Sequence, residues 1–208
     1  MANPQIDTTT YTSLCSLGWR PLLLTGFLVD WMRKHFSVGN VTEDPDLSNT
    51  LWKADDTSVI LIESITRWKP SDTEKRPAVI IRRNDITNER QGIDDKLMGA
   101  FPRTNGPDSF TTYFKGSHTL FCITREGAEA EKLAAEVYRE LVEFGKVYRD
   151  ELRLIKLQLQ SIGAIFKVEE CKETFAVPVT ISYAFDESWT IIPRAPVLKR
   201  IDLSDFQP

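Results

Sequence analysis

The 208-residue chain carries a formal net charge of −4 and has a sequence pI near 5.4. This charge balance argues against a domain that grips duplex nucleic acid, because such domains are usually basic. A hydrophobic content of 41% is typical of a globular protein, and the length fits one large domain or one domain with arms.

The cysteines and the N-terminal sequence indicate the cellular setting. Cys15, Cys122 and Cys171 lack the Cys-x-x-Cys spacing of a zinc site, and their odd number argues against a disulfide framework. The N-terminus has no basic segment followed by an apolar one, and no apolar run approaches the ~20 residues of a membrane span. We therefore expect a soluble protein made in a reducing cytosol, with no membrane partner.

A helix is predicted over residues 20–36, after a polar, Thr-rich segment over residues 1–19. Its apolar residues recur at the spacing of one helix face, and Gly39 follows its end. His35 lies in the last turn with no second ligand residue at ligand spacing along the chain, so we interpret it as structural. The predicted buried stripe comprises Leu23, Leu24, Phe27, Leu28, Trp31 and Met32.

Two apolar segments, residues 58–65 and 77–83, are predicted to be neighbouring central strands. Glycines and prolines interrupt residues 84–107, which predicts a long loop there. Loops of this length in compact domains are usually functional or mobile. An apolar cluster in the loop is a candidate partner contact, because burial against a partner could offset its ordering entropy. The cluster comprises Ile93, Leu97, Met98 and Phe101.

Residues 109–114 and 119–124 are predicted to form a hairpin, with its turn at residues 115–118. The second strand leads directly into a helix predicted over residues 124–149, which Thr124 can cap. Glu136 and Glu140 are predicted on the solvated face of this helix, where they repel each other. The predicted buried face comprises Ala130, Leu133, Ala134, Val137, Tyr138, Leu141, Phe144 and Tyr148.

After the helix, residues 152–160 suit either a continued helix or a strand, and we favour a short break followed by a strand. Residues 164–169 and 175–185 predict a hairpin whose second strand alternates large apolar residues with small ones. Pro178 cannot donate to a ladder, which predicts an open side of this strand. Residues 193–208 predict an extended arm that packs on a neighbouring subunit or an adjacent ring, through Leu198, Ile201, Leu203 and Phe206. The alternative is an arm that folds back over its own sheet.

These elements predict an α+β fold, with a mostly antiparallel sheet of roughly four to five strands packed against a long helix. An N-terminal helix and a C-terminal arm complete the predicted fold. We expect a polar N-terminal segment over residues 1–19, a single domain over residues 20–192 with the long loop 84–107, and the arm over residues 193–208.

No sequence motif for catalysis is present, whether GxSxG, a phosphate-binding glycine loop or HExxH. A metal-dependent nuclease is the enzyme interpretation that the acidic residues allow, but the Glu-x-Lys pairing expected at such a site is absent after Glu63. We therefore expect no enzymatic activity, no catalytic residue, no metal and no cofactor. The acids weighed for that alternative are Asp55, Asp56 and Glu63, or Asp94 and Asp95 beside Lys96.

Several short stretches carry a resemblance to a known family: RPAVII at residues 76–81, GSHT at 116–119, FAVPVTISYAF at 175–185 and ESWTI at 187–191. With the elements around them, over roughly residues 20–192, they resemble the neck and tail-terminator proteins that join head and tail in tailed bacteriophages. The resemblance implies a ring-forming α+β subunit that stops growth of the tail tube and offers a docking face to the head connector. It carries no catalytic residues over to this chain.

The resemblance also implies partners and a location. The chain would associate with itself as a homo-oligomeric ring, with a hexamer expected, and would bind the tail tube protein and the head connector or stopper proteins. DNA would be only passing cargo in a mildly acidic lumen, and the ring would assemble in the host cytoplasm and remain in the tail or neck of the virion. Trp189 joins the predicted interface residues. The competing interpretation is a nuclease-like or other cytosolic α+β enzyme or binding module.

Overall fold

A computed structural model describes residues 11–15, 21–38, 44–55, 57–73, 76–88, 108–169 and 174–193. The chain divides into two compact units, which are described separately. Unit 1 comprises residues 1–18, 88–113 and 186–208, and unit 2 comprises residues 19–87 and 114–185. The helices described below belong to unit 2, and none of them is long and apolar enough to cross a membrane.

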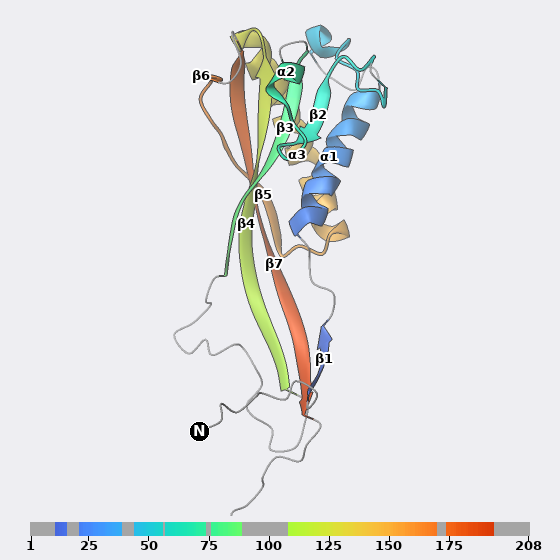
Figure 1. Cartoon of the computed structure of the whole chain (residues 1–208), viewed down its shortest axis with the longest axis vertical. Coiled ribbons are helices and arrows are strands. Elements are labelled where there is room, and N and C mark those ends of the chain that lie inside the picture. The colour runs from blue at the N-terminus through green and yellow to red at the C-terminus, as the bar shows by residue number, and fades with distance from the viewer. Residues whose placement is uncertain are drawn as a thin grey trace, which may run out of the picture. The chain divides into compact units, whose positions relative to one another are not determined.

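The elements follow one another along the chain as labelled in Figure 1. Their bounds are β1 Tyr11–Cys15, α1 Pro21–Ser37, the 3-10 turn η2 Pro45–Leu47, β2 Leu61–Ser64, α2 Pro70–Thr73, β3 Ala78–Asn88, β4 Asp108–Thr124, α3 Gly127–Glu151, β5 Lys156–Ile162, β6 Phe166–Lys167 and β7 Phe175–Pro193. The α+β class predicted from the sequence is confirmed.

The strands of the described residues form a mixed sheet of seven strands in the order β1-β7-β4-β3-β2, with β5 and β6 also paired to β7. Strands β1, β5 and β6 run antiparallel to β7, whereas β2 runs parallel to β3. The prediction of a mostly antiparallel sheet of four to five strands was therefore wrong. The connection between β2 and β3, which contains α2, has the dozen or so residues that a parallel crossover needs. Strand β2 is also an edge strand rather than a central one.

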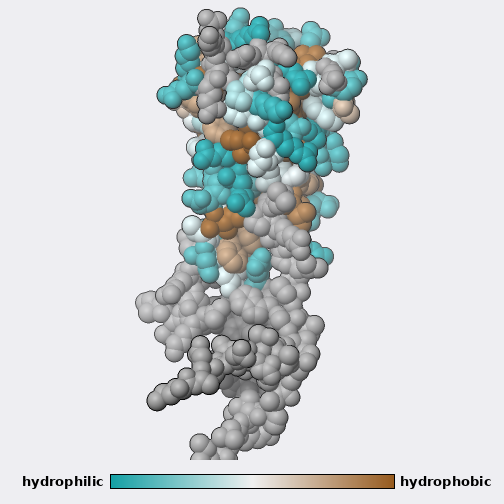
Figure 2. All heavy atoms as spheres, viewed as in Figure 1, coloured by the Kyte–Doolittle hydropathy of each residue, from teal (hydrophilic) through white to brown (hydrophobic). Residues whose placement is uncertain are grey.

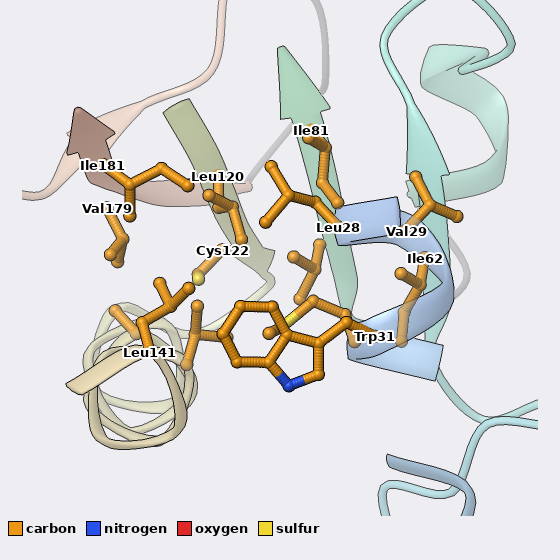
Figure 3. Packing of buried hydrophobic residues seen from close by; sticks show 14 of the residues in the cluster. Leu28, Val29, Trp31, Ile62, Ile81, Leu120, Cys122, Leu141, Val179 and Ile181 are labelled. Carbon is orange, nitrogen blue, oxygen red and sulfur yellow. The ribbon is translucent and has the colours of Figure 1, made fainter. Parts of the chain in front are cut away.

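The core of unit 2 lies between α1, α3 and one face of the sheet (Figures 1 and 3). Side chains of both helices meet side chains of four strands there, including Ile62, Ile81, Leu120 and Ile181. Figure 3 shows Leu28, Trp31, Cys122 and Leu141 in this core, with the indole nitrogen of Trp31 pointing away from the aliphatic side chains. Cys122 is fully buried, and burial raises the pKa of its thiol.

The predicted helix faces are correct for most residues of each helix and wrong for a few. Helix α1 buries most of its predicted stripe, but Leu23 in its first turn is 63% exposed. On α3 the side chains of Tyr138 and Phe144 are 37% and 43% exposed, whereas Glu136 and Glu140 are buried. Helix α1 covers the side of α3 that carries these two acids. The pattern of apolar residues in α3 gives no information about this contact, because it depends on residues of α1.

Strand β4 is continuous from Asp108 to Thr124, so the predicted hairpin at residues 115–118 was wrong. Gly116 lies within the strand, where an added Cβ atom would come 2.6 Å from the ring of Tyr183 on β7. The glycine therefore leaves room for the ring of Tyr183 against the backbone of β4, and it marks no turn. Thr124 does not cap α3 either, because its hydroxyl donates to the carbonyl of Glu126, the residue at the N-cap.

The strands after α3 agree with the favoured alternative. Helix α3 ends before a break in which Arg153 has a φ of 51°, and β5 follows as a strand. Strand β6 pairs with the start of β7 as an antiparallel hairpin. Pro178 does not indicate an unpaired strand, because β7 bonds to β4 and to β6, β5 and β1 along its length. It lies between the pairings of β6 and β5, so its missing N–H interrupts neither.

The two ends of the predicted domain also differ from expectation. The polar segment 1–19 contains strand β1, in which Tyr11 pairs with Pro193 of β7 and Cys15 pairs with Trp189. Pro193 therefore ends a paired strand instead of beginning the extended arm.

Candidate functional site

Most residues predicted to contact partners lie outside the described part of the chain. Trp189 is the exception: its backbone belongs to β7 and pairs with Cys15. For the other candidates the contact with a partner stays a prediction. These residues, which lie outside the described ranges, are Ile93, Leu97, Met98, Phe101, Leu198, Ile201, Leu203 and Phe206.

The acids weighed for a nuclease site that the structure describes have separate partners. The Asp55 carboxylate accepts hydrogen bonds from the hydroxyl and backbone N–H of Thr57, and these bonds lower the pKa of Asp55. The Glu63 carboxylate lies 2.5 Å from the guanidinium of Arg33 on α1. Asp56, Asp94, Asp95 and Lys96 lie outside the described ranges, within which no three His, Cys, Asp or Glu side chains form a cluster suited to a metal.

A buried polar network joins α1 to α3. The Nε2 atom of His35 lies 2.8 Å from Glu136 Oε1, and its Nδ1 atom lies 3.0 Å from Glu140 Oε2. Trp31 Nε1 donates to Glu140 Oε1 at 2.7 Å, and Arg139 donates to Glu136 Oε1 at 2.6 Å. The His35 side chain is only 2% exposed, so these contacts are shielded from water. Both ring nitrogens face carboxylates, which a protonated, doubly donating imidazolium satisfies.

The pKa shifts in this network agree with that protonation state. Burial by itself lowers the pKa of His35, but hydrogen bonds to Glu140 and Glu136 and their negative charges outweigh it and raise the pKa. Burial raises the pKa of Glu140, and the hydrogen bonds from His35 and Trp31, with the positive charges nearby, lower it overall. The sequence interpretation of His35 as structural agrees with this placement, but the two carboxylates beside it were not anticipated.

A second buried histidine, His118 on β4, lies next to Tyr183 on β7, with 5.3 Å between ring centroids. Its Nε2 atom is 2.9 Å from the hydroxyl of Thr25 on α1. Desolvation, reinforced by the positive charge of Arg83, lowers the pKa of His118 to about 4, so the ring is neutral at pH 7. Within the described residues, His118 Nδ1 and the Tyr183 hydroxyl are buried without a hydrogen-bond partner. Two buried polar atoms in the core, His118 Nδ1 and the Tyr183 hydroxyl oxygen, are therefore not satisfied by hydrogen bonds to the described residues.

The outer edge of β2 is closed by hydrogen bonds from the same unit. The carbonyls of Ile60, Ile62 and Ser64 point away from β3, because the intervening residues bond to it. Ile60 O accepts from the hydroxyl of Ser58, Ile62 O accepts twice from Arg33, and Ser64 O accepts from the backbone N–H groups of residues 67 and 68. An incoming strand would find these acceptors already occupied.

We expect Arg33→Ala to lower the free energy of unfolding by about 1–2 kcal/mol, less than the value for fully buried charged hydrogen bonds because Arg33 is partly exposed. The change removes both bonds to Ile62 O, the ion pair with Glu63 and the contact of the guanidinium 5.1 Å from the ring of Trp52. Urea denaturation measures the loss. Lys34→Ala, at an exposed position on the same helix, is the matched control, and equal losses for both variants would contradict the role of Arg33.

On the opposite side of the sheet in unit 2, no described strand pairs with the outer edge of β5. Strand β5 bonds to β7 and to no other described strand, and no described side chain caps its backbone. Ile162 at its end is 47% exposed, and Ile165 and Phe166 beyond it are 39% and 42% exposed. In the space-filling view, hydrophobic residues form patches among hydrophilic ones on the face in view (Figure 2). We call Ile162, Ile165, Phe166 and the open backbone of β5 the β5 edge.

The sequence did not predict this edge, because the predicted strand ended at residue 160 and the next began at residue 164, which left Ile162 between them. The alternation of Leu157 and Leu159 with polar residues was the available signal, since it marks a strand with one buried face. No known protein family matches the sequence, and no curated protein is detectably similar to it.

Proposed function

We propose that the chain is a structural protein of the bacteriophage neck, a ring-forming tail terminator that caps the tail tube and joins it to the head connector. The resemblance of residues 20–192 to neck proteins suggests this role. The structural observation that supports it is the β5 edge of unit 2, where an open strand lies beside three exposed large apolar side chains. A second copy of the chain is the proposed cover for this edge.

A ring requires the β5 edge to bind a different surface of the next copy, because two β5 edges that paired with each other would give a simple dimer. The edge at β2 is capped and the edge at β5 is open, so the two sides of unit 2 offer different surfaces. When one surface binds a different surface on the next copy, repeated association gives a closed ring or an open filament, according to the rotation between copies. A tail terminator requires the closed form, which we propose to be a hexamer.

The remaining partners follow from this position in the virion. One face of the ring would meet the tail tube protein, and the other would meet the connector or stopper proteins of the head. DNA would pass through the lumen as cargo, and the net charge of −4 suits passage without tight binding.

Size measurement and electron microscopy of the pure protein test the proposal. We expect the protein to elute at several times 23.8 kDa and to form rings with a central channel, either alone or on purified tail tubes. Phe166→Asp should abolish the ring, because it places a charge among the exposed apolar residues of the β5 edge. Val142→Asp, at a 54% exposed position on α3, is the control and should leave the ring intact. A monomer that also fails to bind tail tubes would contradict the proposed function.

A further inference from the structure

The two sides of the sheet in unit 2 differ in their ability to accept a strand. At β2 the outward carbonyls of Ile60, Ile62 and Ser64 already have donors. At β5 the ladder with β7 occupies one side of the strand, and the other side has no bonded neighbour among the described residues. Alternate residues of a strand direct their N–H and C=O groups to its two sides, so β5 directs backbone groups outward to which no described strand bonds.

The apolar residues at the β5 edge lie on both faces of the sheet. Ile162 pairs with Val179, whose side chain belongs to the core under the helices. Phe166 pairs with Ala176, which belongs to the small cluster on the opposite face. The ring of Phe166 also lies nearly perpendicular to the ring of Phe121 on that opposite face, with 6.3 Å between centroids. A segment that covers the edge fully therefore needs apolar side chains on both of its faces.

We propose that the β5 edge receives the C-terminal arm, residues 194–208, of a neighbouring copy of this chain as an added strand. This proposal rests on the proposed ring and identifies its donor and acceptor. Added strands gain affinity from main-chain hydrogen bonds and specificity from alternate side chains. The arm leaves from the end of β7 at Pro193, and β5 of the next copy is the acceptor.

The sequence of the arm suits this role. Residues 197–207 contain no proline, so this run of the arm can supply a backbone N–H at every position along the seven residues of β5. In an extended strand, Ile201 and Leu203 lie on one face and Leu198 and Phe206 lie on the other. That division matches an edge with exposed apolar residues on both faces of the sheet.

The arm as a whole is not acidic, because it carries Arg194, Lys199 and Arg200 as well as two aspartates, but those aspartates can set the register of the pairing. Lys156 at the start of β5 is exposed and has no described ion-pair partner. The arm carries Asp202 and Asp205 close to its apolar residues. A carboxylate opposite a lysine on the neighbouring strand stabilises the pair and helps to set the register.

Hydrogen exchange of the assembled, full-length protein tests whether the arm occupies the edge. We compare the wild type with Ile201→Asp/Leu203→Asp, which puts charges at the apolar positions of one face of the arm. The control is Ser204→Asp/Gln207→Asp, which adds the same charge and keeps all four apolar residues. We expect residues 156–162 to exchange at least tenfold faster in the first variant than in the wild type and the control. Residues 61–64 of β2 should exchange equally in all three proteins.

A zero-length carbodiimide cross-link between Lys156 and Asp202 or Asp205 tests whether the arm comes from another copy. Assemblies formed from a mixture of ¹⁵N-labelled and unlabelled chains should give cross-linked peptides with one labelled and one unlabelled partner. Cross-links within one isotope alone, or equal exchange of residues 156–162 in all three proteins, would overturn the proposal. If rings form but residues 156–162 are not protected from hydrogen exchange, only the proposed docking of the arm is contradicted. If residues 156–162 are protected but no rings form, the proposed neck function is contradicted instead.

Discussion

His35→Ala is expected to lower the free energy of unfolding at pH 6 by about 3–5 kcal/mol, the range for breaking a buried ion pair from one side. The substitution leaves the Glu136 and Glu140 carboxylates on the α1-facing side of α3 without the group that bridges them. Arg139 still contacts Glu136, but the described contacts leave Glu140 with Trp31 as its hydrogen-bond donor. Two buried like charges then repel each other across one turn of the helix. Urea denaturation monitored by circular dichroism measures the change.

A compensating variant separates the charge effect from the loss of packing. Glu136→Gln/Glu140→Gln in the His35→Ala background removes the repulsion and should recover at least half of the lost stability. If the triple variant is no more stable than His35→Ala, the loss comes from the cavity left by the imidazole.

The effect of His35→Ala should also depend on pH. Because the pKa of His35 is raised above its ordinary value of 6.5, its contribution is complete below pH 6.5 and is lost as the pH rises through the raised pKa. Because the pKa of Glu140 is lowered below its ordinary value of 4.5, its contribution is present above pH 4.5 and is lost as the pH falls through the lowered pKa. The stability difference between wild type and variant should therefore be largest between pH 4.5 and 6.5, and a difference independent of pH would contradict the charged bridge.

Gly116→Val is expected to destabilise unit 2 by about 1–3 kcal/mol, the usual cost of overpacking a core. An added Cβ atom would lie 2.6 Å from both Cζ and the hydroxyl of Tyr183, and the aromatic ring cannot bend away as a flexible chain end would. Tyr183 is 2% exposed and also stacks with Phe185, so its displacement disturbs further core residues. Thermal and urea unfolding measure the effect.

Gly26→Ala is the matched control, because nothing lies within 4 Å of a Cβ atom built at this glycine in α1. An alanine inside a helix should stabilise the protein by up to about 1 kcal/mol. Tyr183→Leu shortens the side chain that collides with residue 116, so Gly116→Val should cost less in that background than in the wild type. Equal costs in both backgrounds would show that the clash with Tyr183 is not the cause.

The sequence by itself determined the elements whose periodicity is strong. Helix α1 and the apolar face of β7 were predictable because each buries a regular stripe of side chains on one side. The strand after α3 was predictable for the same reason, although its boundary with the helix was not. These features depend on near neighbours in the chain, and the sequence contains all the information about such neighbours.

Tertiary structure alone decided the features that depend on distant residues. A glycine such as Gly116 is typical of a turn. Only the ring of Tyr183, 67 residues further along the chain, explains why this glycine lies within a continuous strand. Glu136 and Glu140 belong to a solvated pattern on α3, and their burial depends on His35 and Trp31 from α1. The capped edge at β2 and the open edge at β5 likewise follow from the order in which the strands pair. Local patterning specifies which side chains a segment can bury, and the partners that the fold brings to it determine which of them are buried.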